Sequence, residues 1–428
     1  MKYLVLTANF APRAASPAIR AVNIVKQLAA IENTYVKVIT YDELTLTSFS
    51  TSDSGLTEKV PKSVEVLRVS SGPIRSRFFK NDNKKSDSAI RNKKKSALIK
   101  NPLINILLPD PHIESVYSFY KAAVKLIDSY KPDVVITHAY PFSFHVLGYL
   151  LKKKYSYIKW VADYGDPWFG RPVAELKVPA WREKIDYIIE KKLLAKASLV
   201  TLTTSPAVSS YKNAFGFLEN KAVVMPMGFD QDDMEYLGNI DLPDELKGKF
   251  LITHTGRIYP EARDPLPFID ALDELCNSSN IVKDSIRVVI VGDLDGYVST
   301  LIKGRPCESV FYFVEWVPAA VSISWMKSSD LLLLFGNKGA TQIPGKVFQY
   351  LGVKRPIFFS YINEEDPTKS LLEQIKSCYT CKNETNKIME AILCLYRRKS
   401  ELVSAGDESN QFSWGNIVKE LDCKLKSL

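Results

Sequence analysis

The sequence predicts an α/β protein with two doubly wound, Rossmann-like domains, and three observations lead to this prediction. The chain has 428 residues, which is too long for one ordinary hydrophobic core. Short apolar runs of strand length alternate with stretches of helical periodicity along most of it. Several of the runs are apolar throughout, which is typical of parallel strands that helices cover on both faces.

The predicted strands fall into two series. The first comprises residues 3–8, 36–41, 64–69, 133–138, 158–163, 198–204 and 222–228, and the second comprises 249–256, 286–292, 310–316, 330–336 and 355–361. Acidic, glycine and proline residues cluster between the two series, in residues 227–249. We therefore place the domain boundary near residue 230.

Composition and the lengths of the apolar runs indicate the cellular compartment of the protein. A chain with 46% hydrophobic and 25% charged residues is typical of soluble globular proteins. No apolar run reaches the 18 residues that a membrane-spanning helix needs, and the apolar run at the start is too short for a signal peptide. We expect a cytosolic protein.

Six cysteines lie in the C-terminal half, and two of them form one CxxC at residues 378–381 without a second pair. We therefore expect no zinc or redox site. We expect the cysteines to be reduced and mostly buried.

The net charge of +9 is concentrated in one segment. Residues 75–100 hold ten Lys or Arg against Asp82 and Asp87, a local balance of +8. One interpretation is a solvated loop. The other is attraction to an anionic membrane surface, with Phe78 and Phe79 as interfacial anchors. No nucleic-acid-binding motif accompanies the charge, so nucleic acid is not an expected partner.

Ligands of open α/β sheets bind at the carboxyl ends of strands, so the loops that follow strands are the candidate sites. Four such loops carry polar side chains: residues 9–20, 139–145, 164–170 and 257–265. Two domains of this kind are expected to face a central cleft, and these loops are expected to share it.

Three cations and a helix start are the best candidates for a phosphate site. Arg257 and Arg263 follow one predicted strand, and Gly345 and Lys346 open a helix after a proline. Guanidinium groups offer paired donors to phosphate oxygens, and a helix N-terminus adds its dipole. The alternative is that both arginines pair with local carboxylates such as Glu261 and Asp264.

These motifs together resemble retaining, family-four-type glycosyltransferases of the GT-B fold. The donor half is represented by "THTGRIYPEARDPLPFIDAL" and "QIPGKVFQYLGVKRPIFF". The acceptor half is represented by "LTANFAPRAASPAIRAVNIVKQL", "LLPDPHIESVY", "KPDVVITHAYPFSFHVLGYLL" and "WVADYGDPW". "FSWGNIVKEL" is similar to the C-terminal helix that crosses back in this fold. The resemblance implies an acceptor domain in residues 1–228, a donor domain in 229–405 and the returning helix in 406–428.

The resemblance also implies a donor. A UDP- or GDP-linked sugar would be held by Arg257, Arg263, Lys346 and Gly345 without a cofactor or a metal. The acidic stretch 230–233 offers carboxylates for Mg²⁺. It falls where the family has its interdomain linker, away from the diphosphate, so we expect no metal there.

The chain departs from the family at two positions. Members commonly carry two glutamates with seven residues between them, and the corresponding residues here are Thr341 and Gln349. Glutamine is able to bind ribose hydroxyls as donor and acceptor. The missing first glutamate leaves the identity of the donor sugar open.

The acceptor side is expected in the N-terminal half. Asp163 and Asp166 are candidates for stabilising charge beside the sugar, and the alternative is that they cap a strand end and a turn. His138 directly follows a strand and is the third catalytic candidate, although a lone histidine is more often structural. The candidates for contacts with the acceptor are Ser16, Arg20, Tyr140 and Trp168, and the two aromatic residues fit the core equally well.

The resulting hypothesis is a retaining glycosyltransferase that acts on a saccharide or lipid-linked saccharide at the inner face of the cytoplasmic membrane. Bacterial O-antigen, capsule or exopolysaccharide synthesis is the setting that the resemblance implies. Two alternatives remain open: a sugar-nucleotide epimerase of the same fold, and a non-catalytic protein that binds sugar nucleotides.

Overall fold

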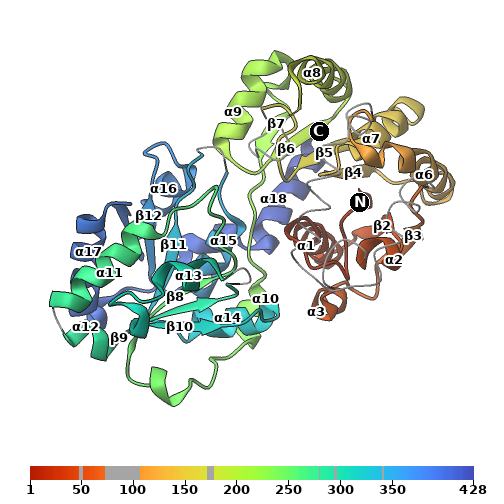
Figure 1. The fold of residues 1–428 in the computed structure, drawn as a ribbon. Coiled ribbons are helices and arrows are strands. Elements are labelled where there is room, and N and C mark those ends of the chain that lie inside the picture. The colour runs from red at the N-terminus through yellow and green to blue at the C-terminus, as the bar shows by residue number, and fades with distance from the viewer. Residues whose placement is uncertain (48–51, 73–106, 171–177, 279, 294–295, 340–341) are drawn as a thin grey trace. The chain divides into compact units, whose positions relative to one another are not determined.

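The computed structural model describes residues 1–47, 52–72, 107–170, 178–278, 280–293, 296–339 and 342–428 (Figure 1). These residues form two compact units, of which unit 1 comprises Met1–Pro226 with Val418–Leu428 and unit 2 comprises Met227–Ile417. The basic segment 75–100 and Thr341 lie outside the described residues. Every strand that the sequence predicts is present, and the predicted fold class is confirmed.

Unit 1 is built on a seven-stranded sheet in the order β3-β2-β1-β4-β5-β6-β7, with every pair of neighbours parallel. Its strands are β1 (Lys2–Thr7), β2 (Tyr35–Tyr41), β3 (Glu65–Val69), β4 (Val134–Ala139), β5 (Lys159–Tyr164), β6 (Leu199–Leu202) and β7 (Ala222–Val224). Its helices include α1 (Ser16–Ala30), α2 (Glu43–Thr47), α3 (Ser54–Glu58), α6 (Val116–Tyr130), α7 (Ser143–Lys154), α8 (Ala180–Leu194) and α9 (Ser205–Ala214).

Unit 2 is built on a six-stranded parallel sheet in the order β10-β9-β8-β11-β12-β13. Its strands are β8 (Phe250–Thr255), β9 (Ile286–Val291), β10 (Phe311–Val314), β11 (Leu331–Phe335), β12 (Ile357–Tyr361) and β13 (Cys378–Lys382). Its helices include α10 (Gln231–Tyr236), α11 (Leu266–Ser278), α12 (Asn280–Ser285), α13 (Tyr297–Ile302), α14 (Ala319–Lys327), α15 (Gly345–Val353), α16 (Pro367–Leu372) and α17 (Thr385–Arg397).

Helices cover both faces of the unit 2 sheet, as the apolar strands predicted. Leu331, Leu333 and Phe335 of β11 pack into the cluster that contains α11 and α17. Leu332 and Leu334, which point to the opposite face, pack into the cluster that contains α15. The continuous apolar run of β11 is therefore explained by burial on both sides.

The CxxC segment lies in a strand that was not predicted from the sequence. Residues 378–382 form the edge strand β13, in which Cys378 and Cys381 are half-buried free thiols. The expectation that most thiols are buried was wrong, because only Cys276 and Cys307 are buried, while Cys394 and Cys423 are exposed.

The last helix, α18 (Trp414–Ser427), begins in unit 2 and belongs to unit 1 from Val418 onward. The hydroxyl of Tyr3 in β1 donates a hydrogen bond to Asp422 of α18 at 2.5 Å. The first strand and the last helix of the chain are thus joined inside unit 1.

The segment that enters unit 2 pairs with the segment that leaves it. The backbone N–H of Phe229 donates to the carbonyl of Phe412 at 3.1 Å, and that of Trp414 donates to Phe229 at 2.9 Å. The Phe229 ring lies so close to Gly352 of α15 that a Cβ there would meet it at 2.5 Å. The start and the end of unit 2 are therefore held side by side.

Strand order reverses direction once in each sheet, between β1 and β4 in unit 1 and between β8 and β11 in unit 2. Crevices for ligands open at such switch points, at the carboxyl ends of the strands. The loops after β1, β4, β8 and β11 are therefore the places to look for a site. None of the described helices is both long and apolar enough to cross a bilayer.

Candidate functional site

The switch point of unit 2 gathers cations around Lys346. β8 ends at Thr255, and Gly256 follows with φ +77°, a conformation that favours glycine. Lys346 is the second residue of α15, and its Nζ lies 3.5 Å from the position that a Cβ on Gly256 would occupy. The left-handed backbone of Gly256, and not the lysine, explains why this turn has a glycine, because 3.5 Å is an ordinary van der Waals contact.

Two protein acceptors hold the Lys346 ammonium. Its Nζ lies 2.6 Å from the carbonyl oxygen of Thr255 and 3.1 Å from Nε2 of His254. Burial and the nearby Arg263 guanidinium lower the pKa of Lys346 well below its usual value. The ammonium is therefore placed where an anion would stabilise its charge.

Arg263 lies beside this lysine and is 7% exposed. Its Nε donates to Asn337 Oδ1 at 3.3 Å and its Nη1 donates to the carbonyl of Arg257 at 3.2 Å. Among the described residues, neither Arg263 nor Lys346 forms an ion pair, while Asp264 accepts the backbone N–H of Leu266. The Asp366 carboxylate lies near enough to Arg263 to act on it electrostatically, but it forms no ion pair with it. Two neighbouring cations without an ion-pair partner among the described residues suit a bound anion.

The other donor-side candidates surround this pair. The Arg257 guanidinium lies 4.9 Å from the ring centroid of Tyr259, a residue of the same loop after β8. Gly345 begins α15, whose N-cap residue Pro344 supplies no side-chain cap. Gln349 is half-buried and lies three residues after Lys346, so both are on one side of the helix.

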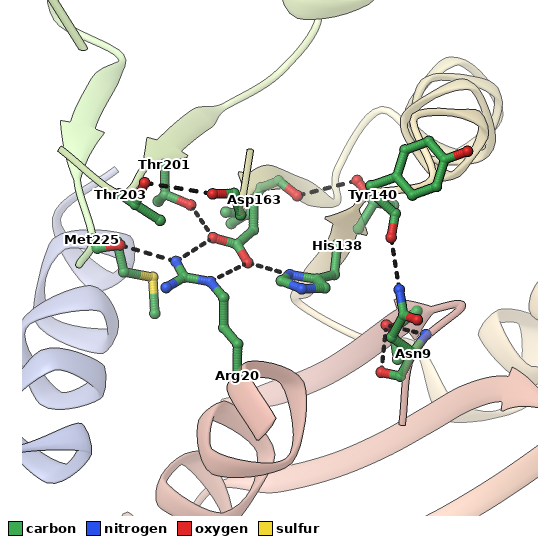
Figure 2. Close-up of polar contacts among 12 residues, drawn as sticks. Asn9, Arg20, His138, Tyr140, Asp163, Thr201, Thr203 and Met225 are labelled. Atoms are coloured by element: carbon green, nitrogen blue, oxygen red, sulfur yellow. Dashed lines mark hydrogen bonds and ion pairs between the residues drawn. The ribbon is translucent and has the colours of Figure 1, made fainter. Parts of the chain in front are cut away.

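The switch point of unit 1 holds a buried charge network, which Figure 2 shows. Arg20 of α1 grips Asp163 of β5 with two bonds, from Nη2 to Oδ1 at 2.7 Å and from Nε to Oδ2 at 3.0 Å. Thr201 Oγ1 donates to Oδ1 at 2.6 Å, and His138 Nδ1 lies 2.5 Å from Oδ2. The Asp163 carboxylate thus makes four contacts with three residues.

This network explains why an acid can be buried here. Burial alone would raise the pKa of the Asp163 carboxyl, but Arg20 and His138 hold it well below its usual range. Arg20 donates further hydrogen bonds to the carbonyls of Met225 at 3.0 Å and Pro226 at 2.9 Å. Asp163 and Arg20, both predicted to act beside a substrate, are therefore mutual partners in the interior of unit 1.

His138 is the member of this network with a polar atom to spare. Its Nε2 is buried and has no hydrogen-bond partner among the described residues. Ala139 ends β4 and Tyr140 begins the loop after it, and the Tyr140 carbonyl accepts a hydrogen bond from Asn9 at 2.7 Å. The loops after β1 and β4 are thus tied together beside His138 (Figure 2).

The remaining acceptor-side candidates are spread over different environments. Trp168 is 2% exposed and stacks on Phe142 with 5.0 Å between ring centroids, so it belongs to the core. Tyr140 and Asp166 are half-buried in the loops that follow β4 and β5, and Ser16 is exposed at the first position of α1.

Three members of these networks were not predicted from the sequence. Asn9 and Thr201 are short polar residues whose roles depend on a neighbouring strand or loop. His254 is the clearest omission, because histidine is unusual in a strand such as β8, in which every residue is buried. That pattern would have been sufficient to identify it.

The described residues contain no group of three or more His, Cys, Asp or Glu side chains placed to hold a metal ion. In the acidic stretch that was weighed as a metal site, Asp230 is 4% exposed and precedes the short helix α10.

Comparison with known proteins adds the fold family. Neither a protein-family model nor a curated relative matches the chain. Solved structures do match over its whole length. A glycosyltransferase from Rickettsia africae superimposes with a TM-score of 0.66 at 13% identity, covering 100% of this chain and 98% of that one. Anabaena HepE in complex with UDP gives 0.63 at 15% identity, with both chains covered fully.

The fold is GT-B. A putative UDP-N-acetylglucosamine 2-epimerase from Listeria monocytogenes shares it, with a TM-score of 0.57 at 13% identity over 99% of this chain and 96% of that one. At such identities the GT-B likeness establishes architecture, and the site must carry the argument for activity.

Proposed function

We propose that the chain is a glycosyltransferase that moves a sugar from a nucleotide-diphosphate donor to a saccharide or lipid-linked saccharide. The observation that carries this proposal is the pair of cations, Arg263 and Lys346, which lie at the switch point of unit 2 and form no ion pair among the described residues. A diphosphate supplies the charge that such a pair lacks. We assign the diphosphate to Lys346, Arg263, Arg257 and the start of α15 at Gly345.

The rest of the donor falls to neighbouring residues. Gln349 lies on the same side of α15 as Lys346, is half-buried like it, and offers an amide to ribose hydroxyls. Thr341, which precedes α15 in the sequence, is assigned to the sugar. A UDP-linked donor is the first to test, because HepE was crystallised with UDP and with UDP-glucose.

In unit 1 we assign different roles to the acidic and basic partners. Asp163 has its oxygens occupied by Arg20, Thr201 and His138, so it positions the imidazole rather than contacting substrate. His138 Nε2 is the polar atom left for a sugar hydroxyl. Asp166, Tyr140 and Ser16 are the acceptor-side residues that are half-buried or exposed.

We propose transfer with retention. The bond from the anomeric carbon to the diphosphate oxygen breaks, and a bond to the acceptor oxygen forms on the same face. The acceptor proton passes to the departing diphosphate oxygen, whose negative charge Arg257, Arg263 and Lys346 stabilise. No protein nucleophile and no metal takes part in this scheme.

The setting we propose is bacterial surface polysaccharide assembly at the inner face of the cytoplasmic membrane. The basic segment 75–100, with its balance of +8, is assigned to contact with anionic lipid.

Incubation with a panel of labelled UDP- and GDP-sugars and a membrane extract tests the proposal. Transfer of label to a saccharide or lipid product is the expected result, and the Lys346→Ala variant is the control. The shared fold of the Listeria protein favours an epimerase as the second candidate. Epimerised sugar nucleotide without any acceptor would support that candidate, and binding without turnover would support a non-catalytic role.

A further inference from the structure

His254 occupies a position in β8 where a charged or polar side chain is costly. β8 lies between β9 and β11, and all six of its residues are buried. His254 pairs in register with Ile290 of β9, and its ring lies 5.5 Å from the ring of Phe335 in β11. Most buried side-chain polar atoms have a hydrogen-bond partner, and both ring nitrogens of His254 have one.

The partners of His254 define its tautomer. Nδ1 lies 2.9 Å from the carbonyl oxygen of Leu333, which only accepts hydrogen bonds, so Nδ1 carries the proton. Nε2 then has a lone pair and accepts from the Lys346 ammonium at 3.1 Å. The imidazole, which is fixed in a rigid strand, thus restrains the orientation of a flexible lysine.

A neutral imidazole is the form that this environment favours. The charged and titratable groups around it are Lys346 and Tyr350 of α15 and Arg263 of the loop after β8. Burial, Lys346 and Arg263 lower the pKa of His254 well below its usual value. A protonated ring would lose its acceptor and repel the ammonium.

An ammonium has three N–H donors. For Lys346, one is directed at His254 and one at the carbonyl of Thr255. Two fixed acceptors define the direction of the third donor, so a side chain with four rotatable bonds presents one N–H at a set angle.

We propose that His254 is a positioning residue that orients Lys346 so that its third N–H faces the bound diphosphate. The proposal rests on the assignment of Lys346 to the diphosphate of the donor. It goes beyond that assignment because it identifies what holds the lysine in a productive geometry before ligand binds.

Binding of UDP and of inorganic pyrophosphate, measured by calorimetry, tests the proposal with four variants. His254→Phe keeps a ring but removes both hydrogen bonds, and His254→Gln offers one donor and one acceptor again. Lys346→Met reports whether the lysine binds the diphosphate at all. The matched control is His145→Gln, which changes another fully buried histidine, in unit 1, whose Nδ1 lies 2.9 Å from Thr137 Oγ1.

We expect His254→Phe to weaken UDP binding by about 10- to 100-fold, the loss of one hydrogen bond to a charged group. His254→Gln and His145→Gln are expected to stay within about threefold of the wild type. Wild-type affinity in His254→Phe overturns the proposal. An equal loss in His254→Gln also overturns it, because the acceptor is then not what matters.

A second measurement separates failure of this inference from failure of the proposed function. The rate at which acetic anhydride acetylates Lys346, followed by peptide mass spectrometry, needs no ligand. A lysine released from His254 should react roughly tenfold faster in His254→Phe and at the wild-type rate in His254→Gln. If Lys346→Met binds UDP and inorganic pyrophosphate as tightly as the wild type, the diphosphate assignment is wrong. Unchanged acetylation in His254→Phe would show that His254 does not orient the lysine.

Discussion

Replacing Asp163 by asparagine should destabilise unit 1 more than any surface substitution. The change removes the negative charge that Arg20 contacts at 2.7 Å and leaves a guanidinium buried beside a neutral amide. An asparagine NH2 group in place of Oδ1 would also point a donor at other donors, because Arg20 and Thr201 both donate hydrogen bonds to Oδ1. Removing one partner of a buried ion pair costs about 3–5 kcal/mol.

Hydrogen exchange followed by mass spectrometry localises this loss. A destabilisation of about 3 kcal/mol speeds exchange of globally protected amides by about 100-fold. Peptides from β4 and β5 should show the change, while peptides from β8 and β11 of unit 2 should not. Asp244→Asn, which breaks an exposed pair with Lys247, is the control and should leave exchange unchanged.

The pH dependence has a definite sign. The pKa of Asp163 is lower in the folded protein than in the unfolded chain, where it is about 3.9. Its stabilising contribution is therefore complete above that value and is lost as the pH falls below it. Asp163→Asn should consequently flatten the acid limb of the stability profile. Wild-type exchange rates in β4 and β5 of Asp163→Asn would refute the reasoning.

A compensating pair sharpens the test. Arg20→Met combined with Asp163→Leu removes both buried charges, so it should be less destabilised than Asp163→Asn alone. If the double variant is worse than the single one, packing around the pair matters more than its charges.

Four further predictions concern ligands. Lys346→Ala or Arg257→Ala should lower kcat/KM for the donor by about 30- to 1000-fold, or about 2–4 kcal/mol, and unchanged kinetics in a folded variant would remove the site assignment. Gln349→Leu should weaken donor binding by about 1–3 kcal/mol while Gln349→Glu retains activity; wild-type affinity in the leucine variant would contradict the ribose assignment. Burial and Arg263 lower the pKa of Lys346, and a bound diphosphate raises it. Above the lowered pKa, where part of Lys346 is neutral, UDP binding should take up protons and strengthen as the pH falls; below it, where Lys346 is an ammonium, no uptake is expected. Calorimetry in buffers of different ionisation enthalpy that shows no proton uptake at any pH up to the ordinary lysine pKa would argue against this linkage. Replacing the three lysines at 93–95 by glutamine should reduce sedimentation with acidic vesicles, and wild-type binding should fade with salt as the Debye length falls from about 10 to about 3 Å; equal binding to neutral vesicles would leave the segment as a solvated loop.

The strands could be predicted from the sequence because burial on both faces leaves a plain apolar signature. β13 could not, since it lies at a sheet edge, carries no continuous apolar run, and has four half-buried residues and one exposed residue. Lys346 was found from its local setting, a proline-glycine turn before a helix. The pairing of Arg20 with Asp163 was out of reach, because 143 residues separate them and only the strand order brings them together.

His254 and Trp168 illustrate the same limit in opposite directions. Trp168 was expected to be either a sugar platform or core, and only packing against Phe142 decides for the core. His254 needs a carbonyl from β11 and an ammonium from α15, and neither is near it in sequence.

The pairing of Phe229 with Phe412 and Trp414 has a consequence for how the chain is made and divided. Residues 227–417 form one uninterrupted stretch whose two ends meet, as in a domain inserted into a loop of another. A gene fragment encoding only these residues should therefore yield a self-contained body. A fragment ending at residue 226 should not yield a self-contained body, because it lacks the end of α18. That end contains Val418 and Leu425, which are fully buried, and Asp422, which accepts a hydrogen bond from the Tyr3 hydroxyl. On the ribosome, the first unit to be translated is accordingly the last to be completed.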